Sequence, residues 1–106
     1  MAYIRKSPPR AEFLAKAKES GQAVFLDQGY TAVPQRSGAA VVMRPAVVLR
    51  YAMSVPQRGG GGAIEYVFNE TLVADASGEV DYSTSLLNEL KTEGIVTQGT
   101  RDGSRF

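Results

Sequence analysis

The sequence predicts a small α+β domain: an antiparallel sheet of about three to four strands with a long hairpin, packed with an N-terminal helix and a C-terminal helix. Three observations lead to this prediction. The length of 106 residues suits one domain. The middle of the chain alternates apolar and polar residues, and two helical segments with recognisable end signals flank it. We expect one domain over residues 1–96 and a polar tail over residues 97–106.

The first predicted helix covers Pro8–Ser20. Ser7 is its expected N-cap, and the prolines that follow occupy first-turn positions where a missing N–H costs little. Gly21 can end the helix in the left-handed conformation. A short strand over residues 23–26 is expected next, and Gly29 interrupts it.

The longest predicted strand covers residues 39–55. Its odd positions are all apolar or nearly so, whereas its even positions include Arg44 and Arg50, so one face should point inward. Pro45 lacks the backbone donor, which places it at a sheet edge or at a bend. At about 3.3 Å per residue the stretch would reach on the order of 55 Å. Either the chain bends sharply at Pro45, or a long hairpin arm projects from the body.

The next predicted strand, over residues 63–74, alternates in the same way. Glu70 falls on its apolar side, which indicates that this end of the strand leaves the core. Residues 75–78 read Asp-Ala-Ser-Gly, a typical turn sequence. This turn leads towards the second helix.

The second predicted helix covers Ser83–Glu93 and carries three leucines on one side. Its end is defined by Gly94, which can adopt the left-handed conformation. Ile95 can then pack back on Leu90, the hydrophobic contact of a Schellman motif. We therefore expect the helix to stop at this glycine.

Composition excludes several kinds of functional site. The chain has no Cys and no His, so it has no disulfide, thiolate zinc site, iron–sulfur cluster, cysteine nucleophile or imidazole base. Asp75, Glu79 and Asp81 are close in sequence, but they lack the ligand periodicity of an EF-hand. We expect no catalytic residue, no cofactor and no metal site, and hence no enzyme.

A six-residue pattern occurs twice. Residues 33–38 read Val-Pro-Gln-Arg-Ser-Gly, and residues 55–60 read Val-Pro-Gln-Arg-Gly-Gly. Two hairpin loops with similar turn chemistry would explain the repeat, and so would a pair of arginine-tipped loops that contact a partner. A meander would place the two loops at opposite ends of the sheet, whereas a reversal at Pro45 would place them together. The glycine run over residues 59–62 lacks the Lys-Ser or Lys-Thr ending of a phosphate-binding loop and predicts a hairpin tip.

Charge is divided into zones along the chain. Residues 28–64 contain four arginines and no acid, a charge of +4, whereas residues 65–93 contain seven acids against Lys91, a charge of −6. Adjacent strands could exchange ion pairs, for example Arg50 with Glu65, each worth a fraction of a kcal/mol. Alternatively the zones form a basic and an acidic side, which suits stacking of like subunits or docking on a partner with reversed zones.

These observations favour a non-catalytic protein-interaction module, a structural or assembly subunit of a larger complex such as a virion- or tail-like particle. Zoned charge, an overlong hairpin and polar termini support this interpretation. One alternative is a small protein that binds and inhibits or regulates another protein. The expected partner-binding residues are Arg36, Arg44, Arg50, Arg58, Glu65, Glu70, Glu79 and Phe106.

The other alternative is a nucleic-acid-binding protein that uses Arg36, Arg44, Arg50 and Arg58. The pI of about 8.0 is below that of a dedicated nucleic-acid binder. Tyr66 and Phe68 lie on the buried side of their strand, so no stacking platform is evident. Neither a secretion signal nor a membrane span is expected, which predicts a cytoplasmic or virion-associated protein.

Overall fold

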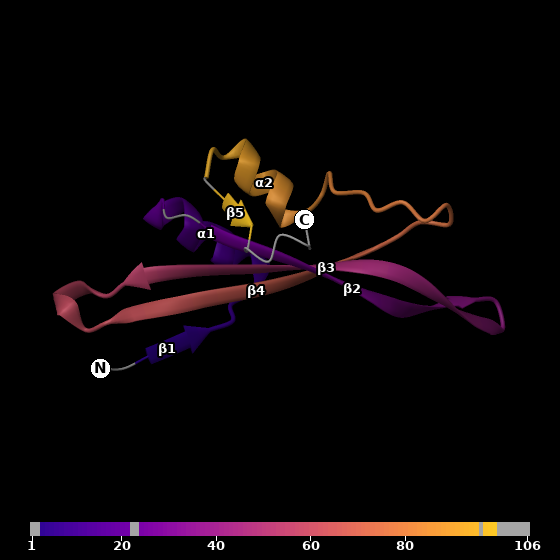
Figure 1. Cartoon of the computed structure of the whole chain (residues 1–106), viewed down its shortest axis with the longest axis horizontal. Coiled ribbons are helices and arrows are strands. Elements are labelled where there is room, and N and C mark those ends of the chain that lie inside the picture. The colour runs from indigo at the N-terminus through magenta and orange to yellow at the C-terminus, as the bar shows by residue number, and fades with distance from the viewer. Residues whose placement is uncertain (1–2, 22–23, 96, 100–106) are drawn as a thin grey trace.

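The computed structural model describes residues 3–21, 24–95 and 97–99. The strands in this part of the chain form one sheet in the order β1-β4-β3-β2-β5. Two α-helices accompany the sheet, so the predicted α+β class is confirmed (Figure 1). The elements are β1 (Tyr3–Lys6), α1 (Arg10–Ser20), β2 (Val24–Ser37), β3 (Ala40–Pro56), the 3-10 turn η1 (Arg58–Gly60), β4 (Ala63–Val73), α2 (Leu86–Thr92) and β5 (Thr97–Gly99).

The centre of the sheet is an antiparallel meander of β2, β3 and β4. Two short parallel strands, which the sequence did not predict, extend it: β1 beside β4, and β5 beside β2. Strand β5 consists of the first residues of the expected polar tail, which join the sheet next to Val24–Leu26. The remaining tail residues, Phe106 among them, lie outside the described residues.

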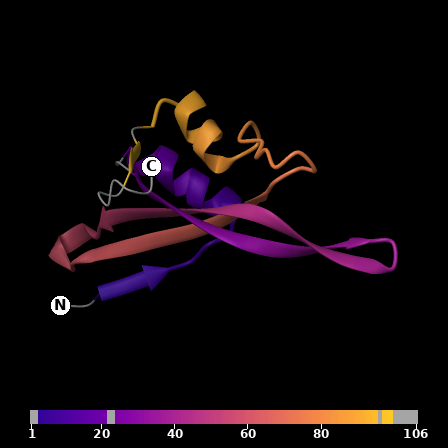
Figure 2. The same cartoon turned by 45° about the vertical axis from the view of Figure 1, so that its right-hand side comes forward.

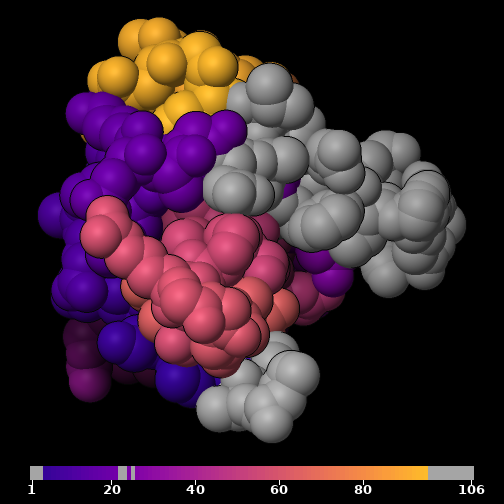
Figure 3. Space-filling view, turned by 90° about the vertical axis from the view of Figure 1, so that its left-hand side faces the viewer, coloured from indigo at the N-terminus to yellow at the C-terminus, as the bar shows by residue number. Residues whose placement is uncertain are grey.

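Both helices cover the same face of the sheet (Figures 1 and 2). From Val47 to Met53 the buried residues of β3 have odd numbers, as the alternating sequence predicts, and Ala46 is buried as well. Figure 3 looks onto the end of the sheet at the glycine-rich loop, with α2 at the top, above the strands. The core between helices and sheet contains Phe13, Leu14, Ala17, Val24, Leu26, Val47, Leu49, Tyr51, Met53, Tyr66, Leu86 and Leu90.

Helix α1 starts later than the sequence predicts. Its N-cap is Pro9, in an extended conformation, and the Phe13 N–H donates to the Pro9 carbonyl over 2.9 Å. The predicted cap, Ser7, therefore lies before the helix, because the first helical hydrogen bond is made to the carbonyl of Pro9. The other end is as predicted: Gly21 has a φ of 62° and its N–H donates to the Ala17 carbonyl.

Helix α2 starts at Leu86 rather than at the predicted Ser83, and Ser85 is its N-cap. The Ser85 hydroxyl accepts a hydrogen bond from the backbone N–H of Asn88 over 3.1 Å. At the other end the Ile95 N–H donates to the Leu90 carbonyl, and the Gly94 N–H donates to the next carbonyl along, both over 3.0 Å. This hydrogen-bond pattern confirms the predicted Schellman motif.

Replacing Gly94 by alanine should lower the free energy of unfolding by about 1 kcal/mol, because its φ of 77° is unfavourable for a residue with a Cβ. Urea unfolding measures this change. Gly94→Asn is the matched control and should lose less, since asparagine tolerates the left-handed conformation. Equal losses in the two variants would contradict the explanation.

Strand β2 passes through Gly29 without interruption, so the predicted short strand over residues 23–26 is wrong in its length. The ladder with β3 continues through Gly29, which pairs with Val48, as far as Ser37. A Cβ built on Gly29 would lie 3.1 Å from Nη1 of Arg50. The glycine thus leaves room for the arginine side chain across the strand.

Strand β3 continues straight through Pro45, and the second of the two predicted alternatives, the projecting arm, is the one found. The molecule measures 57 × 27 × 26 Å and is elongated along this hairpin. The two similar loops lie at opposite ends of β3, which excludes a joint site containing both Arg36 and Arg58 (Figure 1).

Candidate functional site

The candidate site is the outer part of the hairpin formed by β2 and β3. The last ladder pair between β3 and β4 joins Ala46 to Val73. Beyond it, residues 32–45 form a ribbon of only two strands, which we call the arm. Gly38 and Ala39 connect the strands, and the φ of 63° at Gly38 fits a type II′ turn. The arm projects away from the helices (Figure 2).

Large apolar side chains are exposed on the arm and at its base, and most of them lie on one side; Val42, 43% exposed, lies on the other side. Tyr30 is 73% exposed, Val41 60% and Met43 58%. Tyr30 pairs with Val47, whose side chain belongs to the core, and Val41 and Met43 share the parity of Val47. Tyr30, at the base of the arm, and Val41 and Met43, within it, therefore lie on the helix side, and we call these three residues the apolar stripe.

Val41 and Met43 of the stripe lie on the same side of β3 as its core residues. They lie beyond the point where the helices and β4 end, so no other element of the described chain covers them. Val47, Leu49, Tyr51 and Met53 are buried, as the alternating pattern predicts. The prediction of an inward-facing side is wrong for the outer residues of β3, because neither a helix nor β4 reaches them. Parity shows which side a residue faces, but it carries no information on whether another layer is present.

An acidic loop over residues 75–81 follows β4 and reaches out along the arm on the helix side (Figures 1 and 2). Asp75 accepts hydrogen bonds from the Ser77 hydroxyl and from the Glu79 N–H, and these bonds lower the pKa of its carboxyl group. The pKa of Asp81 is lowered by hydrogen bonds from Ser83. Both carboxylates stabilise local turns, and the turn at Asp75 is the one that the sequence predicts.

The Glu79 carboxylate differs from its two neighbours in this loop. Within the described residues no hydrogen bond or ion pair engages its oxygens, and the residue is exposed. Of the three acids in the loop, Glu79 is thus the one whose carboxylate is not engaged by the described residues and is open to a partner.

The four candidate arginines do not form one surface. Arg36 lies near the tip of the arm and Arg58 in the glycine-rich loop at the far end. Arg50 forms an ion pair with Asp27, with Nη2 2.6 Å from the carboxylate. Arg44 lies near Asp75 and contributes to the lowered pKa of that carboxyl.

The acidic candidates on β4 are engaged within the chain. Adjacent strands do exchange ion pairs, as one of the two interpretations predicts, but not in the example of Arg50 with Glu65. Glu65 accepts a hydrogen bond from Nε of Arg5 over 2.9 Å, and the register places it opposite Ser54, away from Arg50. Asp27 was not included in the charge zones drawn from the sequence. It lies directly opposite Arg50 in the β2–β3 ladder. This ladder position explains why Arg50 pairs across to β2.

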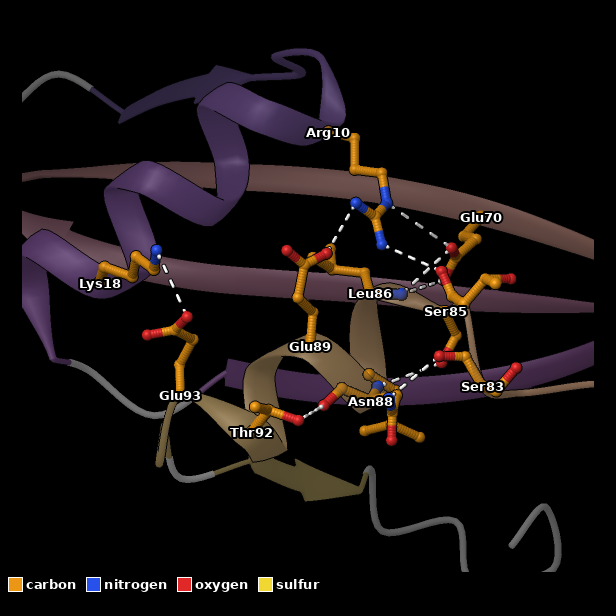
Figure 4. A network of polar contacts seen from close by, with 12 residues as sticks. Arg10, Lys18, Glu70, Ser83, Ser85, Leu86, Asn88, Glu89, Thr92 and Glu93 are labelled. Carbon is orange, nitrogen blue, oxygen red and sulfur yellow. Dashed lines mark hydrogen bonds and ion pairs between the residues drawn. The ribbon is translucent and has the colours of Figure 1, made fainter.

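Glu70 remains close to the core, contrary to the prediction that its end of the strand leaves it. Its side chain is only 12% exposed. Its carboxylate accepts the Leu86 N–H over 3.0 Å and the Tyr51 hydroxyl over 2.9 Å. A carboxylate at this position satisfies donors at the start of α2 that would otherwise be unpaired (Figure 4).

Tyr51 connects this carboxylate to a second donor. Its hydroxyl accepts the Leu87 N–H over 2.9 Å while it donates to Glu70. Burial, and then the hydrogen bond to Glu70, raise the pKa of the phenol above its ordinary value of 10.0. The polar cluster is thus built into the contact between sheet and helix, where it holds α2 in place.

Arg10 completes the cluster at its exposed edge. Its Nη1 lies 2.8 Å from the Glu89 carboxylate, and its Nη2 donates to the Thr84 carbonyl over 3.1 Å (Figure 4). Lys18 and Glu93 form a second link between the helices, at 3.5 Å. These contacts join α1 to α2 and leave the arm untouched.

The sheet face opposite the helices carries a shallow hollow of about 360 Å³. The ion pairs of Arg5 with Glu65 and of Arg50 with Asp27 both line it, together with Val67 and Asn69. Each of the four charged groups in this hollow already has a partner of opposite sign within the chain.

Other features of the described residues add no site. No three Asp or Glu side chains converge there in an arrangement that could hold a metal ion. Neither helix in that part of the chain has the length and apolar character needed to span a membrane. No protein-family model, curated protein or solved structure matches this chain significantly.

Proposed function

We propose that this protein is a non-catalytic interaction module that assembles with further copies of itself through the arm. The observation that carries the proposal is the exposed apolar stripe of Tyr30, Val41 and Met43 on a ribbon with no covering layer. Exposed apolar patches of this kind mark interaction sites. A two-stranded hairpin is at best marginally stable in water, so a partner that covers the stripe would also stabilise the arm.

The distribution of charge supports a protein partner over a nucleic acid. A polyanion is bound best by several cations on one continuous surface. Here Arg50 is paired with Asp27, and Arg36 and Arg58 lie at opposite ends of the molecule. A larger particle built from this subunit, virion- or tail-like, is the assembly that the sequence favours and stays a prediction.

The arm can be shortened without touching the core, which gives a direct test. Replacing residues 34–43 by Asn-Gly connects Val33 to Arg44 through a two-residue turn. Val33 and Arg44 face each other in the ladder and form the same hydrogen-bonded type of pair as Ser37 and Ala40, which close the natural turn. We expect the native protein to form dimers or larger species with rising concentration in light scattering. The shortened variant should stay monomeric with a melting temperature within a few degrees of the native value.

Three results would contradict this function. The first is a native protein that stays monomeric at high micromolar concentration. The second is a shortened variant that assembles as well as the native chain. The third is association that requires added DNA or RNA and disappears at high salt, which would favour nucleic-acid binding.

A further inference from the structure

The free edges of the arm carry prolines that point outward. Ser37 and Ala40 close a two-residue loop, so they form a hydrogen-bonded pair, and the pairs along the ribbon alternate from there. Pro34 and Pro45 both fall in pairs whose backbone groups point away from the ribbon. The Ala74 N–H, which donates to the Pro45 carbonyl over 2.9 Å from outside the ribbon, agrees with this orientation.

Outward prolines make these edges poor templates for a further strand. A proline offers no N–H to an approaching strand, and natural proteins use it to prevent pairing between edges. Each edge of the arm has one, Pro34 on β2 and Pro45 on β3. The apolar stripe, in contrast, remains open over the same length of ribbon. The apolar stripe on the face of the arm is therefore a better docking surface than either of its edges.

We infer that two copies of this chain pack their arms face to face and antiparallel about a two-fold axis, with stripe against stripe. The inference rests on the proposed function, because it specifies how the copies associate. In such an isologous contact every interaction is made twice. Tyr30, Val41 and Met43 would then be covered by the same residues of the other copy.

Charge complementarity argues for a second copy as the occupant. Arg36 pairs directly with Val41, so it lies at the tip of the arm on the same side as the stripe. The acidic loop starts beside the base of the arm, where the Ala74 N–H donates to the Pro45 carbonyl. The next N–H, that of Asp75, donates to the Glu79 carbonyl over 2.8 Å, which keeps Glu79 close to this base. Antiparallel packing brings the tip of one arm to the base of the other, and so brings Arg36 to Glu79 of the other copy.

Both charges are available for this contact. Among the residues that the structure describes, no acid pairs with Arg36 and no base pairs with Glu79. The loop lies on the helix side of the sheet (Figure 2). The stripe residues lie on the same side by their ladder positions, and they are exposed. One chain thus presents an apolar face, a free cation at one end and a free anion at the other, a self-complementary set.

Cysteine cross-linking tests the packed face, since the native chain has no cysteine. In Met43→Cys the thiol lies on the stripe side, near the middle of the ribbon, whereas in Val42→Cys it lies on the opposite side and is also exposed (43%). A short bismaleimide should convert Met43→Cys to a covalent dimer at least about tenfold faster than Val42→Cys. Equal rates for the two variants would overturn the inference.

Charge exchange tests the antiparallel orientation. Arg36→Glu should raise the dimer dissociation constant by about tenfold, because two exposed ion pairs become repulsive. Adding Glu79→Arg to the same chain should restore most of the affinity, since complementarity returns. Arg58→Glu makes the same change of charge at the opposite end of the molecule and should leave the dissociation constant within twofold.

The two proposals fail in different ways. A native protein that is monomeric throughout light scattering removes both. If the native protein associates, two results contradict the face-to-face arrangement alone. One is cross-linking of Met43→Cys no faster than that of Val42→Cys, and the other is a dimer affinity that Glu79→Arg does not restore. Assembly would in that case proceed through another surface of the chain.

Discussion

Replacing Glu70 by alanine is expected to lower the free energy of unfolding by about 3 kcal/mol. The change removes the acceptor for the Leu86 N–H and for the Tyr51 hydroxyl, and both donors lie at the buried contact between the sheet and α2. Donors left unpaired in a buried position lose the hydrogen bonds that water gives them in the unfolded chain. Urea unfolding followed by circular dichroism measures the loss.

Two matched variants separate this explanation from a simple change of charge. Glu70→Gln keeps one carbonyl oxygen as an acceptor, so it should lose about 1 kcal/mol. Glu89→Ala removes the exposed partner of Arg10 and should lose less than about 1 kcal/mol. A loss for Glu70→Ala no larger than that for Glu89→Ala would show that the cluster is unimportant for stability.

The same cluster changes how a charge-reversal experiment must be designed. Glu65, Glu70 and Glu79 all belong to the acidic zone in the sequence. Glu65 is bound to Arg5, and Glu70 caps α2, so their replacement by lysine would also break contacts within the chain. Only Glu79 can be reversed to probe assembly without this complication.

Much of the fold follows from local signals in the sequence. The two glycine helix ends, the alternating strands and the turn at Asp75 depend on residues close together in the chain, and their predictions are confirmed. The helix starts were misplaced because serine and proline occur at several neighbouring positions. Which of them caps the helix is decided by contacts with the rest of the molecule.

The edge strands depend on non-local pairing and were missed for that reason. Strand β5 has only three residues, Thr97–Gly99, and no apolar alternation of its own. Strand β1 likewise has four residues and joins β4 from the other end of the chain. Pairs as short as these form only where a neighbouring edge already exists.

The candidate site could be predicted in part from the sequence, because the two predicted strands differ in length. The strand predicted over residues 39–55 is five residues longer than the one predicted over residues 63–74. Its outer residues must therefore lack a neighbour on one side. The apolar side chains Val41 and Met43 were assigned to the core by their parity, whereas helices and β4 both end before reaching them.

Tyr51 should give the protein a specific loss of stability at alkaline pH. In the unfolded chain the phenol ionises near pH 10, but in the fold burial and the Glu70 carboxylate raise its pKa. Above pH 10 the unfolded state therefore binds fewer protons than the folded state, and the free energy of unfolding falls as pH rises. This residue should contribute about 1.4 kcal/mol per pH unit until the folded phenol itself ionises.

Comparison with Tyr51→Phe isolates this contribution from the other groups that titrate in the same range. At neutral pH the variant should be less stable by about 1–2 kcal/mol, because the Leu87 N–H loses its acceptor. Above pH 10 the phenylalanine has no proton to lose, so the difference between the two proteins should shrink and then reverse. Tyr82→Phe is a change at an exposed tyrosine, and the difference in the free energy of unfolding between this variant and the native protein should stay constant over the same pH range. A constant difference between native and Tyr51→Phe proteins from about pH 8 to about pH 11.5 would mean that the phenol ionises as readily in the fold as in the unfolded chain.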